Sequence, residues 1–209
     1  QQPSLVALPH HMIRPIGLSL SGHHHLLLTG PRGCGKTQAL EWIKHLYPQN
    51  QNRSILNYYL THELKSQKIP EYEPYFFVRK VHGTVKSAGL TGRITSHGFY
   101  PGELSLAHEG VLLADELAEW PRDAREVLRE PLETGQLTLM RAHGSLICPT
   151  DFLFVGSTNR CPCALAHCRC NDFVKKQYIQ RLSGPILDRI DLVIEMEQPI
   201  PSLKKTITM

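Results

Sequence analysis

The sequence predicts an α/β domain built on a doubly wound parallel sheet. Short apolar runs that suit buried strands recur along the chain, and segments with helix signals lie between them. Strands that alternate with helices are typical of a parallel sheet with helices on both faces. The first run leads into a glycine-rich segment, which is common where such a sheet binds a ligand. The strand-like runs are 25–29, 110–115, 152–158 and 191–195.

Length and composition are those of an ordinary globular domain. With 209 residues, 41% of them apolar and 20% charged, the chain can bury a substantial core. A net charge of +4 permits nucleic-acid binding without demonstrating it. No apolar run is long enough for a transmembrane helix, and no signal-peptide pattern opens the chain. We therefore expect a cytoplasmic protein with no membrane partner.

The first half of the chain alternates strand and helix signals. After the run 25–29, residues 37–47 have helical spacing of their apolar residues, and the Pro-Gln-Asn-Gln-Asn segment at 48–52 ends that helix. We expect a further helix at 54–64 and a strand at 75–78.

Glycines and prolines punctuate the second half. Residues 83–102 contain five glycines and few large apolar residues, which predicts a long irregular insertion. Residues 121–134 predict one helix with Pro121 in its first turn, and 136–149 predict a hairpin around Ala142-His143-Gly144-Ser145. A last helix is expected at 173–182.

These signals suggest one core domain with extensions. Residues 1–22 are interpreted as a lead-in from a longer chain, because Gln1 is not an initiator methionine. Residues 23–197 form the predicted core domain, with the insertion at about 80–102 and the hairpin at about 136–149. Residues 198–209 are interpreted as a tail.

The segment after the first strand fits the pattern G-x-x-x-x-G-K-[ST]. Its glycines let backbone N–H groups point at phosphate oxygens, and the N-terminus of the next helix adds positive potential. Lys36 can reach the β- and γ-phosphates, and the Thr37 hydroxyl can bind Mg²⁺. The sequence therefore predicts an ATP and Mg²⁺ site at Gly30, Pro31, Arg32, Gly33, Cys34, Gly35, Lys36 and Thr37.

Polar residues follow the next two apolar runs. Asp115 ends the run 110–115, where it can hold the Mg²⁺ shell, and the adjacent Glu116 can polarise an attacking water. Asn159 follows the run 152–158 and can position water or bind the γ-phosphate, although a simple turn residue is the alternative. Catalytic roles are predicted for all three.

Arg189 lies in a charged segment, Asp188-Arg189-Ile190-Asp191. It can pair locally with either aspartate, or it can serve as an arginine finger for a neighbouring subunit. Spacing alone does not decide between the two.

Four cysteines crowd into ten residues as C-x-C-x4-C-x-C: Cys161, Cys163, Cys168 and Cys170. Four thiolates can close a tetrahedral Zn²⁺ site, although C-x-C is tighter than the usual spacing. Free thiols or a disulfide are the alternatives, and structural zinc is favoured.

Basic residues are frequent in the insertion and the hairpin. Such residues can line a nucleic-acid channel, or they can form a solvated loop surface. They are Lys80, His82, Lys86, Arg93, His97, Arg141 and His143.

Several longer segments resemble the magnesium-chelatase-like AAA+ proteins of the ComM/YifB type, over about residues 22–197. These segments are 101–117 (PGELSLAHEGVLLADEL), 129–135 (REPLETG), 141–142 (RA), 159–163 (NRCPC) and 181–191 (RLSGPILDRID).

The resemblance implies an AAA+ ATPase that assembles as a ring, usually a hexamer, with ATP between subunits, and that acts as a DNA branch-migration helicase. It implies that Lys36 and Thr37 are the Walker A pair and that Asp115 and Glu116 are Walker B. Asn159 would be sensor 1 and Arg189 the arginine finger in trans. The hairpin at 136–149 would be an insertion that faces the pore, with Arg141 near DNA.

The sequence also departs from the family pattern. Arg32 and Cys34 replace a proline and a serine of the usual loop, and Arg160 and Ala164 replace a proline and a glycine. One histidine of the Ala-Pro-His-His-Thr segment is lost at 80–84. The helical lid and the amino-terminal Lon-like domain of full-length members are absent from this sequence, so weak hydrolysis is expected.

Two other functions compete with the DNA motor. One is the ATPase subunit of a magnesium chelatase, which serves insertion of a divalent metal into a tetrapyrrole. The other is a module that binds nucleotide without turnover. The cysteine cluster and the Leu-Ser-Leu-Ala-His run at 104–108 favour the ComM type.

Overall fold

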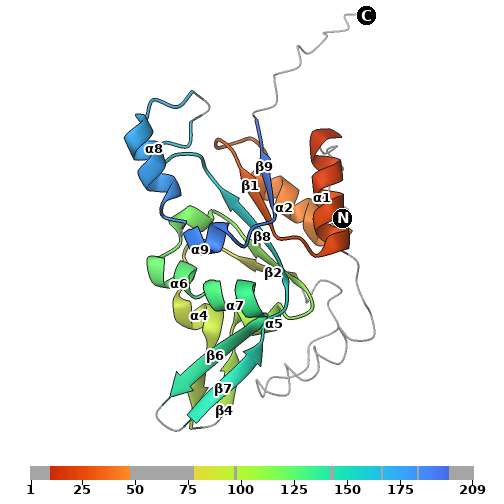
Figure 1. The fold of residues 1–209 in the computed structure, drawn as a ribbon, viewed down its shortest axis with the longest axis vertical. Coiled ribbons are helices and arrows are strands. Elements are labelled where there is room, and N and C mark those ends of the chain that lie inside the picture. Colours follow the sequence, from red (N-terminus) through yellow and green to blue (C-terminus); the bar gives the residue numbers. More distant parts are fainter. Residues whose placement is uncertain are drawn as a thin grey trace, which may run out of the picture.

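The computed structural model describes residues 10–47, 78–96, 98–141, 144–165, 167–182 and 184–197. Five parallel strands pair in the order β2-β5-β8-β1-β9, so the predicted parallel sheet is confirmed (Figure 1). The strands are β1 (Leu26–Thr29), β2 (Val78–Val81), β5 (Val111–Ala114), β8 (Leu153–Thr158) and β9 (Leu192–Glu195).

The central strands are buried on both faces, which explains their unbroken apolar runs. Successive side chains of a strand point to opposite faces, so each strand serves two cores. In β1, Leu26 and Leu28 belong to one buried cluster and Leu27 to the other. In β8, Val155 and Phe154 are divided in the same way. The sheet is therefore doubly wound.

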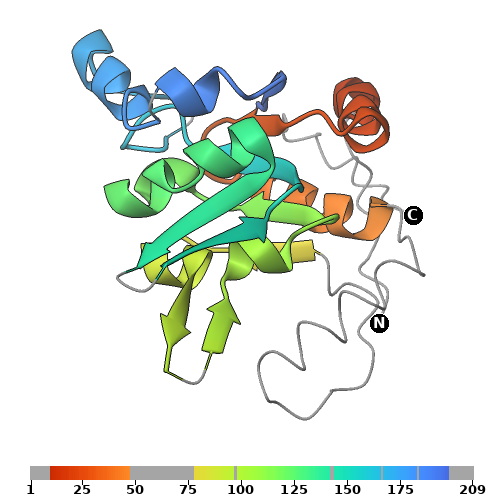
Figure 2. The same cartoon turned by 60° about the horizontal axis from the view of Figure 1, so that its bottom comes forward.

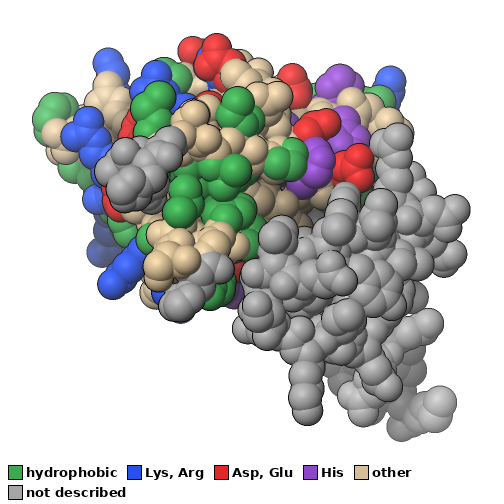
Figure 3. All heavy atoms as spheres, turned by 90° about the horizontal axis from the view of Figure 1, so that it is seen from below, with side chains coloured by type: hydrophobic (Ala, Val, Ile, Leu, Met, Phe, Trp, Pro, Cys, Tyr) green, Lys and Arg blue, Asp and Glu red, His purple; other side chains and the backbone are tan. Residues whose placement is uncertain are grey.

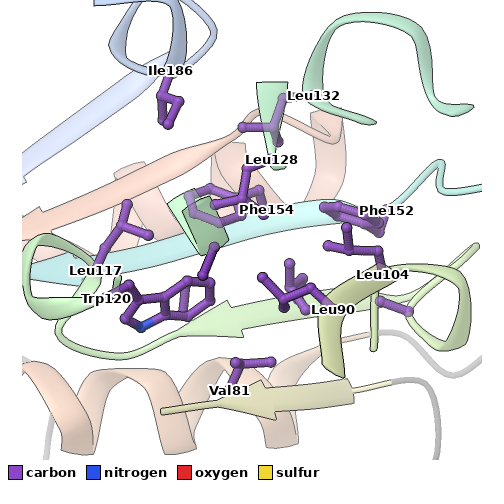
Figure 4. Close-up of a cluster of buried hydrophobic side chains, with 14 of the residues drawn as sticks. Val81, Leu90, Leu104, Leu117, Trp120, Leu128, Leu132, Phe152, Phe154 and Ile186 are labelled. Atoms are coloured by element: carbon purple, nitrogen blue, oxygen red, sulfur yellow. The ribbon is translucent and has the colours of Figure 1, made fainter. Parts of the chain in front are cut away.

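Different helices supply the two cores. Helices α1 (His10–Gly22) and α2 (Lys36–Leu46) contribute to one. The other, larger core contains Trp120 and Phe154 and is drawn in Figure 4. Its helices are α4 (Ser87–Thr91), α5 (Glu103–Leu106), α6 (Arg122–Glu126), α7 (Arg129–Thr134), α8 (Asp172–Ile179) and α9 (Gly184–Leu187).

Helices α1, α4, α5 and α9 have no counterpart in the sequence prediction. Helix α1 falls in the segment interpreted as a lead-in, and it buries Met12 and Ile16, one helical turn apart. Pro15 and Gly17 obscure this spacing, because both residues usually interrupt helices. Helix α9 is a single turn that buries Ile186.

The expectation of an irregular segment at 83–102 is wrong. This part of the chain forms α4 and an antiparallel hairpin of β3 (Gly92–Thr95) and β4 (Gly98–Pro101). The fully buried Leu90 anchors it. A Cβ on Gly102 would collide with the backbone of Leu90 and Gly92, so here a glycine permits close packing of ordered backbone.

The expected single helix at 121–134 is also divided in two, preceded by a short 3-10 turn at Leu117–Glu119. Pro131 has no N–H and clashes with the carbonyl four residues earlier, so the helix cannot run straight through. Leu128 N–H bonds instead to the Arg125 carbonyl three residues back, at 3.0 Å. Pro121 is the residue before α6 rather than part of its first turn.

The remaining elements agree with the prediction or lie outside the described residues. The hairpin at 136–149 is confirmed as β6 (Gln136–Arg141) and β7 (Gly144–Pro149). Helix α8 ends at Ile179, three residues short of the expected end, because Arg181 and Leu182 bond to carbonyls three residues back. The predicted helix at 54–64 and residues 75–77 of the predicted strand lie outside the described residues.

The β3–β4 and β6–β7 hairpins lie at the same end of the molecule, remote from α8 (Figures 1 and 2). None of the helices in the described part of the chain combines the length and apolar character of a membrane span.

Because Gly102 lies against backbone, we expect Gly102→Ala to lower the free energy of unfolding by about 1–3 kcal/mol. Gly89→Ala is the matched control, since its added Cβ would lie 3.6 Å from Val85 Cγ2 and alanine favours helix α4. Urea denaturation of the two variants checks the difference. Equal stability of the two would contradict the close packing described here.

Candidate functional site

Three segments for which the sequence predicts functional residues meet at the carboxyl edge of the sheet. Strands β1, β5 and β8 are parallel neighbours, so the residues that follow them lie at the same edge. The loop 30–37 follows β1, Asp115 follows β5 and Asn159 follows β8. The Gly30 N–H donates to the Thr158 carbonyl at 3.3 Å, which ties the loop to β8.

Glycines set the shape of the loop 30–37. Gly33 and Gly35 have φ of 80° and 91°, values that favour glycine, and Gly35 is the residue before α2. A Cβ on Gly30 would lie 2.5 Å from the Met196 carbonyl oxygen and 2.7 Å from Cys34 Sγ. The loop thus leads into an 11-residue helix, α2. The N–H groups at the N-terminus of a helix bind anions favourably.

The Lys36 side chain is folded over this loop and is only 8% exposed. Its Nζ donates to the carbonyl oxygens of Gly30 and Pro31, at 2.8 and 2.7 Å. Cys34 Sγ lies 3.8 Å from the same nitrogen. The ammonium is therefore held at the loop by backbone carbonyls, at the helix end where phosphate would bind.

A buried carboxylate joins the ends of the three strands. Thr37 Oγ1 donates to Asp115 Oδ2 at 3.1 Å, and Ser157 Oγ donates to Asp115 Oδ1 at 2.6 Å. Asp115 is 7% exposed and Ser157 is fully buried. Hydrogen bonds to both oxygens offset the cost of burying the charge. Hydroxyl and carboxylate oxygens are ligands that suit Mg²⁺.

Glu116 is directed differently from Asp115. Its φ of 53° lies in the left-handed region, and its N–H donates to Ser157 Oγ at 3.1 Å. The side chain is exposed. This turn separates the two adjacent carboxylates, so one is buried in the hydrogen-bond network while the other faces solvent.

Two buried side chains, Trp120 and Arg125, hold the turn after Asp115. Trp120 Nε1 donates to the Asp115 carbonyl at 2.9 Å, and Arg125 Nη1 donates to the carbonyls of Ala118 and Trp120. Trp120 and Arg125 are 1% and 7% exposed. These buried donors fix the backbone that carries both carboxylates.

Asn159 is half-buried at the end of β8, beside Tyr178 of α8. The Tyr178 hydroxyl donates to Glu119 Oε1 at 2.8 Å. Burial and the Glu119 carboxylate raise the pKa of Tyr178 to about 12, so the phenol stays protonated at neutral pH.

Arg189 lies at the amino-terminal ends of the parallel strands, whereas the loop 30–37 lies at their carboxyl ends. It comes shortly before β9, and the N–H groups of Asp191 and Leu192 bond to the carbonyl of His25, the residue before β1. Its Nη2 lies 2.5 Å from Glu133 Oε2, and its Nη1 donates to the Pro185 carbonyl at 2.8 Å. Arg189 is therefore not brought together with the loop of its own chain.

The four clustered cysteines lie directly after Asn159 with their sulfur atoms together. All four Sγ atoms are within 4.8 Å of one another. Desolvation by burial raises the pKa of Cys161 to about 12, while the Leu165 backbone hydrogen bond lowers the pKa of Cys163 to about 6. A group of four sulfur atoms could hold a metal ion.

The described basic residues of the insertion differ in their surroundings. Lys80 pairs with Glu41 at 2.5 Å, and the Arg93 guanidinium carbon lies 5.0 Å from the centre of the Tyr100 ring. His82 and Lys86 are exposed. His97 and His143 lie outside the described residues, and only the backbone of Arg141 is described, in β6.

Sequence reasoning missed Ser157 and Tyr178. Ser157 could have been found, because a hydroxyl within an apolar strand usually needs a buried partner. Tyr178 approaches Asn159 only through the tertiary placement of α8, for which the sequence carries no signal.

Comparisons with known proteins agree with this architecture. The family model described as magnesium chelatase, subunit ChlI, matches residues 5–203. The chain is 37% identical over 202 residues to "Uncharacterized protein YifB" of Escherichia coli, which covers 93% of the chain and 39% of that protein. It is 33% identical over 204 residues to "Competence protein ComM" of Haemophilus influenzae, covering 94% and 39%. The chain thus spans about two-fifths of the length of these relatives.

Because Ser157 bonds to Asp115 and to the Glu116 backbone, we expect Ser157→Ala to lower the free energy of unfolding by about 1–3 kcal/mol. Ser87→Ala is the control, since its hydroxyl also donates to an aspartate, Asp123, but on the exposed surface. It should leave stability nearly unchanged. Chemical denaturation measures both, and a Ser87→Ala effect as large as that of Ser157→Ala would contradict the role of burial.

Proposed function

We propose that this chain, which belongs to the magnesium chelatase subunit ChlI family, binds ATP with Mg²⁺ at the loop 30–37 and hydrolyses it. The observation that carries the proposal is the convergence of Lys36, Thr37 and Asp115 at one sheet edge, with Thr37 Oγ1 only 3.1 Å from Asp115 Oδ2. A phosphate-binding helix end, a buried cation and a Mg²⁺-type oxygen pair are together the parts that ATP recognition requires.

The residues present fit both ligands. Gly30, Gly33 and Gly35 leave the loop backbone open to phosphate oxygens, and Lys36 adds a positive charge. Thr37 and Asp115 would hold Mg²⁺, which when bound neutralises charge on the phosphate oxygens. Ser157 would keep the Asp115 carboxylate oriented toward Thr37.

Hydrolysis requires a positioned water. We assign its orientation to the exposed carboxylate of Glu116, together with Asn159 at the end of the neighbouring strand β8. Attack of water on the γ-phosphorus forms one P–O bond and breaks the bond to the β-phosphate oxygen, which yields ADP and inorganic phosphate. The Glu116 carboxylate accepts the proton that the attacking water loses.

Arg189 serves the site of a neighbouring copy. Its place at the far edge of the sheet keeps it from the loop of its own chain, while an assembly that stacks this edge on another copy's loop would bring it to the γ-phosphate. The proposal therefore includes a ring of copies with ATP between them, and we assign six copies from the family resemblance.

We further propose that ATP hydrolysis is coupled to DNA. The two hairpins lie at one end of the molecule, where hydrophobic side chains gather on the visible face (Figure 3). Met140 and Ile147 of the β6–β7 hairpin are 75% and 61% exposed. Exposed Arg93 lies over Tyr100 in the β3–β4 hairpin. Cationic and aromatic side chains suit contacts with single-stranded DNA. We infer that the two hairpins face the pore of the ring and contact DNA there during branch migration.

ATPase assays of the protein with and without branched DNA test this function. We expect Lys36→Ala to abolish ATP binding, and Glu116→Gln to keep binding while lowering turnover by about 10²-fold or more. Lys176→Ala, which removes an exposed lysine from α8, should retain activity. Unchanged DNA-stimulated activity in Lys36→Ala would refute the proposal.

The same assay separates the competing functions. Stimulation by a porphyrin rather than by DNA would favour the magnesium chelatase type. Binding of ATP with no turnover under either condition would favour a module that uses nucleotide as a structural ligand.

The shared site predicts complementation between variants. Arg189→Ala alone should lose on the order of 10³-fold in ATPase activity, and mixing it with the inactive Glu116→Gln variant should restore part of that activity. In a mixed ring, the interfaces in which the Glu116→Gln subunit offers its Arg189 to the site of the Arg189→Ala subunit have both residues intact. Arg129→Ala removes another carboxylate-paired arginine and should stay active. Lack of any recovery in the mixture would argue against a finger in trans.

A further inference from the structure

The four sulfur atoms after β8 are arranged as a metal site is arranged. Cys161 Sγ lies 3.2 Å from both Cys163 Sγ and Cys168 Sγ, and Cys163 Sγ lies 3.7 Å from Cys168 Sγ. Four thiolates around Zn²⁺ at about 2.3 Å have sulfur–sulfur edges of about 3.8 Å. A disulfide requires about 2.05 Å, which none of these pairs approaches. The distances therefore match four ligands around one ion more closely than paired cysteines.

The segment that carries the cysteines has little regular structure of its own. Its described residues between β8 and α8 form neither helix nor strand. A backbone hydrogen bond from the Ala164 N–H to the Cys161 carbonyl, at 3.1 Å, closes a turn that contains the first two cysteines. A bound metal would join both halves of such a segment through four bonds, as structural zinc does in small modules.

This segment also contacts the phosphate-binding loop. The Arg32 N–H donates to the Ala164 carbonyl at 2.7 Å, and Ala164 directly follows Cys163. Ala164 has φ of 55°, a strained value for alanine that persists only where surrounding contacts fix the backbone. Position 32 is in the middle of the loop 30–37, so whatever fixes Ala164 also fixes the loop.

A second contact joins the segment to the next strand. The Arg160 guanidinium lies 2.7 Å from Glu195 Oε1 and 3.4 Å from the Met196 carbonyl, and the Met196 N–H bonds to the Thr29 carbonyl. Through Arg160 and Met196, the segment is therefore also linked to Thr29, the last residue of β1, directly before the loop 30–37.

We propose that Cys161, Cys163, Cys168 and Cys170 bind one Zn²⁺, and that the metal-held segment braces the ATP-binding loop through Ala164 and Arg32. The first half stands on the sulfur geometry alone. The second half rests on the proposed function, because it concerns affinity for nucleotide.

Metal analysis of the protein, purified in reducing buffer without chelator, tests the first half. About one zinc per chain is expected, together with the visible spectrum of tetrahedral cobalt thiolate after reconstitution with Co²⁺. The Cys163→Ser/Cys168→Ser variant should lose the metal. Cys148→Ala, which removes a buried cysteine outside the cluster, should keep it. Wild-type protein with no zinc and no cobalt spectrum overturns the site, whether or not the variants fold.

Nucleotide binding before and after metal removal tests the brace. Affinity for a fluorescent ATP analogue should fall about tenfold when zinc is stripped, and should return when Zn²⁺ is restored. Zinc bound at one per chain with the same affinity in both forms overturns the brace. Failure of both forms to bind nucleotide at all overturns the proposed function instead, while the zinc stoichiometry still reports on the site itself.

Discussion

The buried carboxylate of Asp115 is the point on which the arrangement of this site depends. It accepts one hydrogen bond from Thr37 at the start of α2 and one from Ser157 in β8, so it fixes three neighbouring chain segments to one another. A carboxylate only 7% exposed is tolerable because both oxygens have donors. Moving any one of the three strand ends would leave a buried polar group without a partner.

The sheet edge organised in this way holds only part of the proposed catalytic set. Lys36, Thr37, Asp115, Glu116 and Asn159 gather at the carboxyl ends of β1, β5 and β8. Arg189 is held at the other edge by Glu133 and the Pro185 carbonyl. Parallel strands make this separation unavoidable, since residues before a strand and residues after its neighbour lie at opposite edges. Cooperation between copies thus follows from topology if Arg189 acts on ATP, as we propose.

Much of this fold could be predicted because the central strands are buried on both faces and so read as continuous apolar runs. Glycine spacing marked the loop, and the cysteine spacing marked the sulfur cluster. Helix α1 was missed because Pro15 and Gly17 interrupt the signal of its buried face. The hairpin of β3 and β4 was missed because Gly92 and Gly102 allow close packing, which looks like disorder in a sequence. Tyr178 and the place of Arg189 depend on tertiary packing and have no local signal.

The departures of the loop from its family pattern have a physical explanation in the same contacts. Cys34 is 7% exposed and packs in the core that α1 and α2 share with the sheet, so its sulfur is a packing group. At position 32 the backbone N–H contacts Ala164, and this contact is available to any residue except proline. The arginine at this position thus permits a hydrogen bond that the family's usual proline could not make. The proposed phosphate cradle consists of backbone, so neither side chain is part of it.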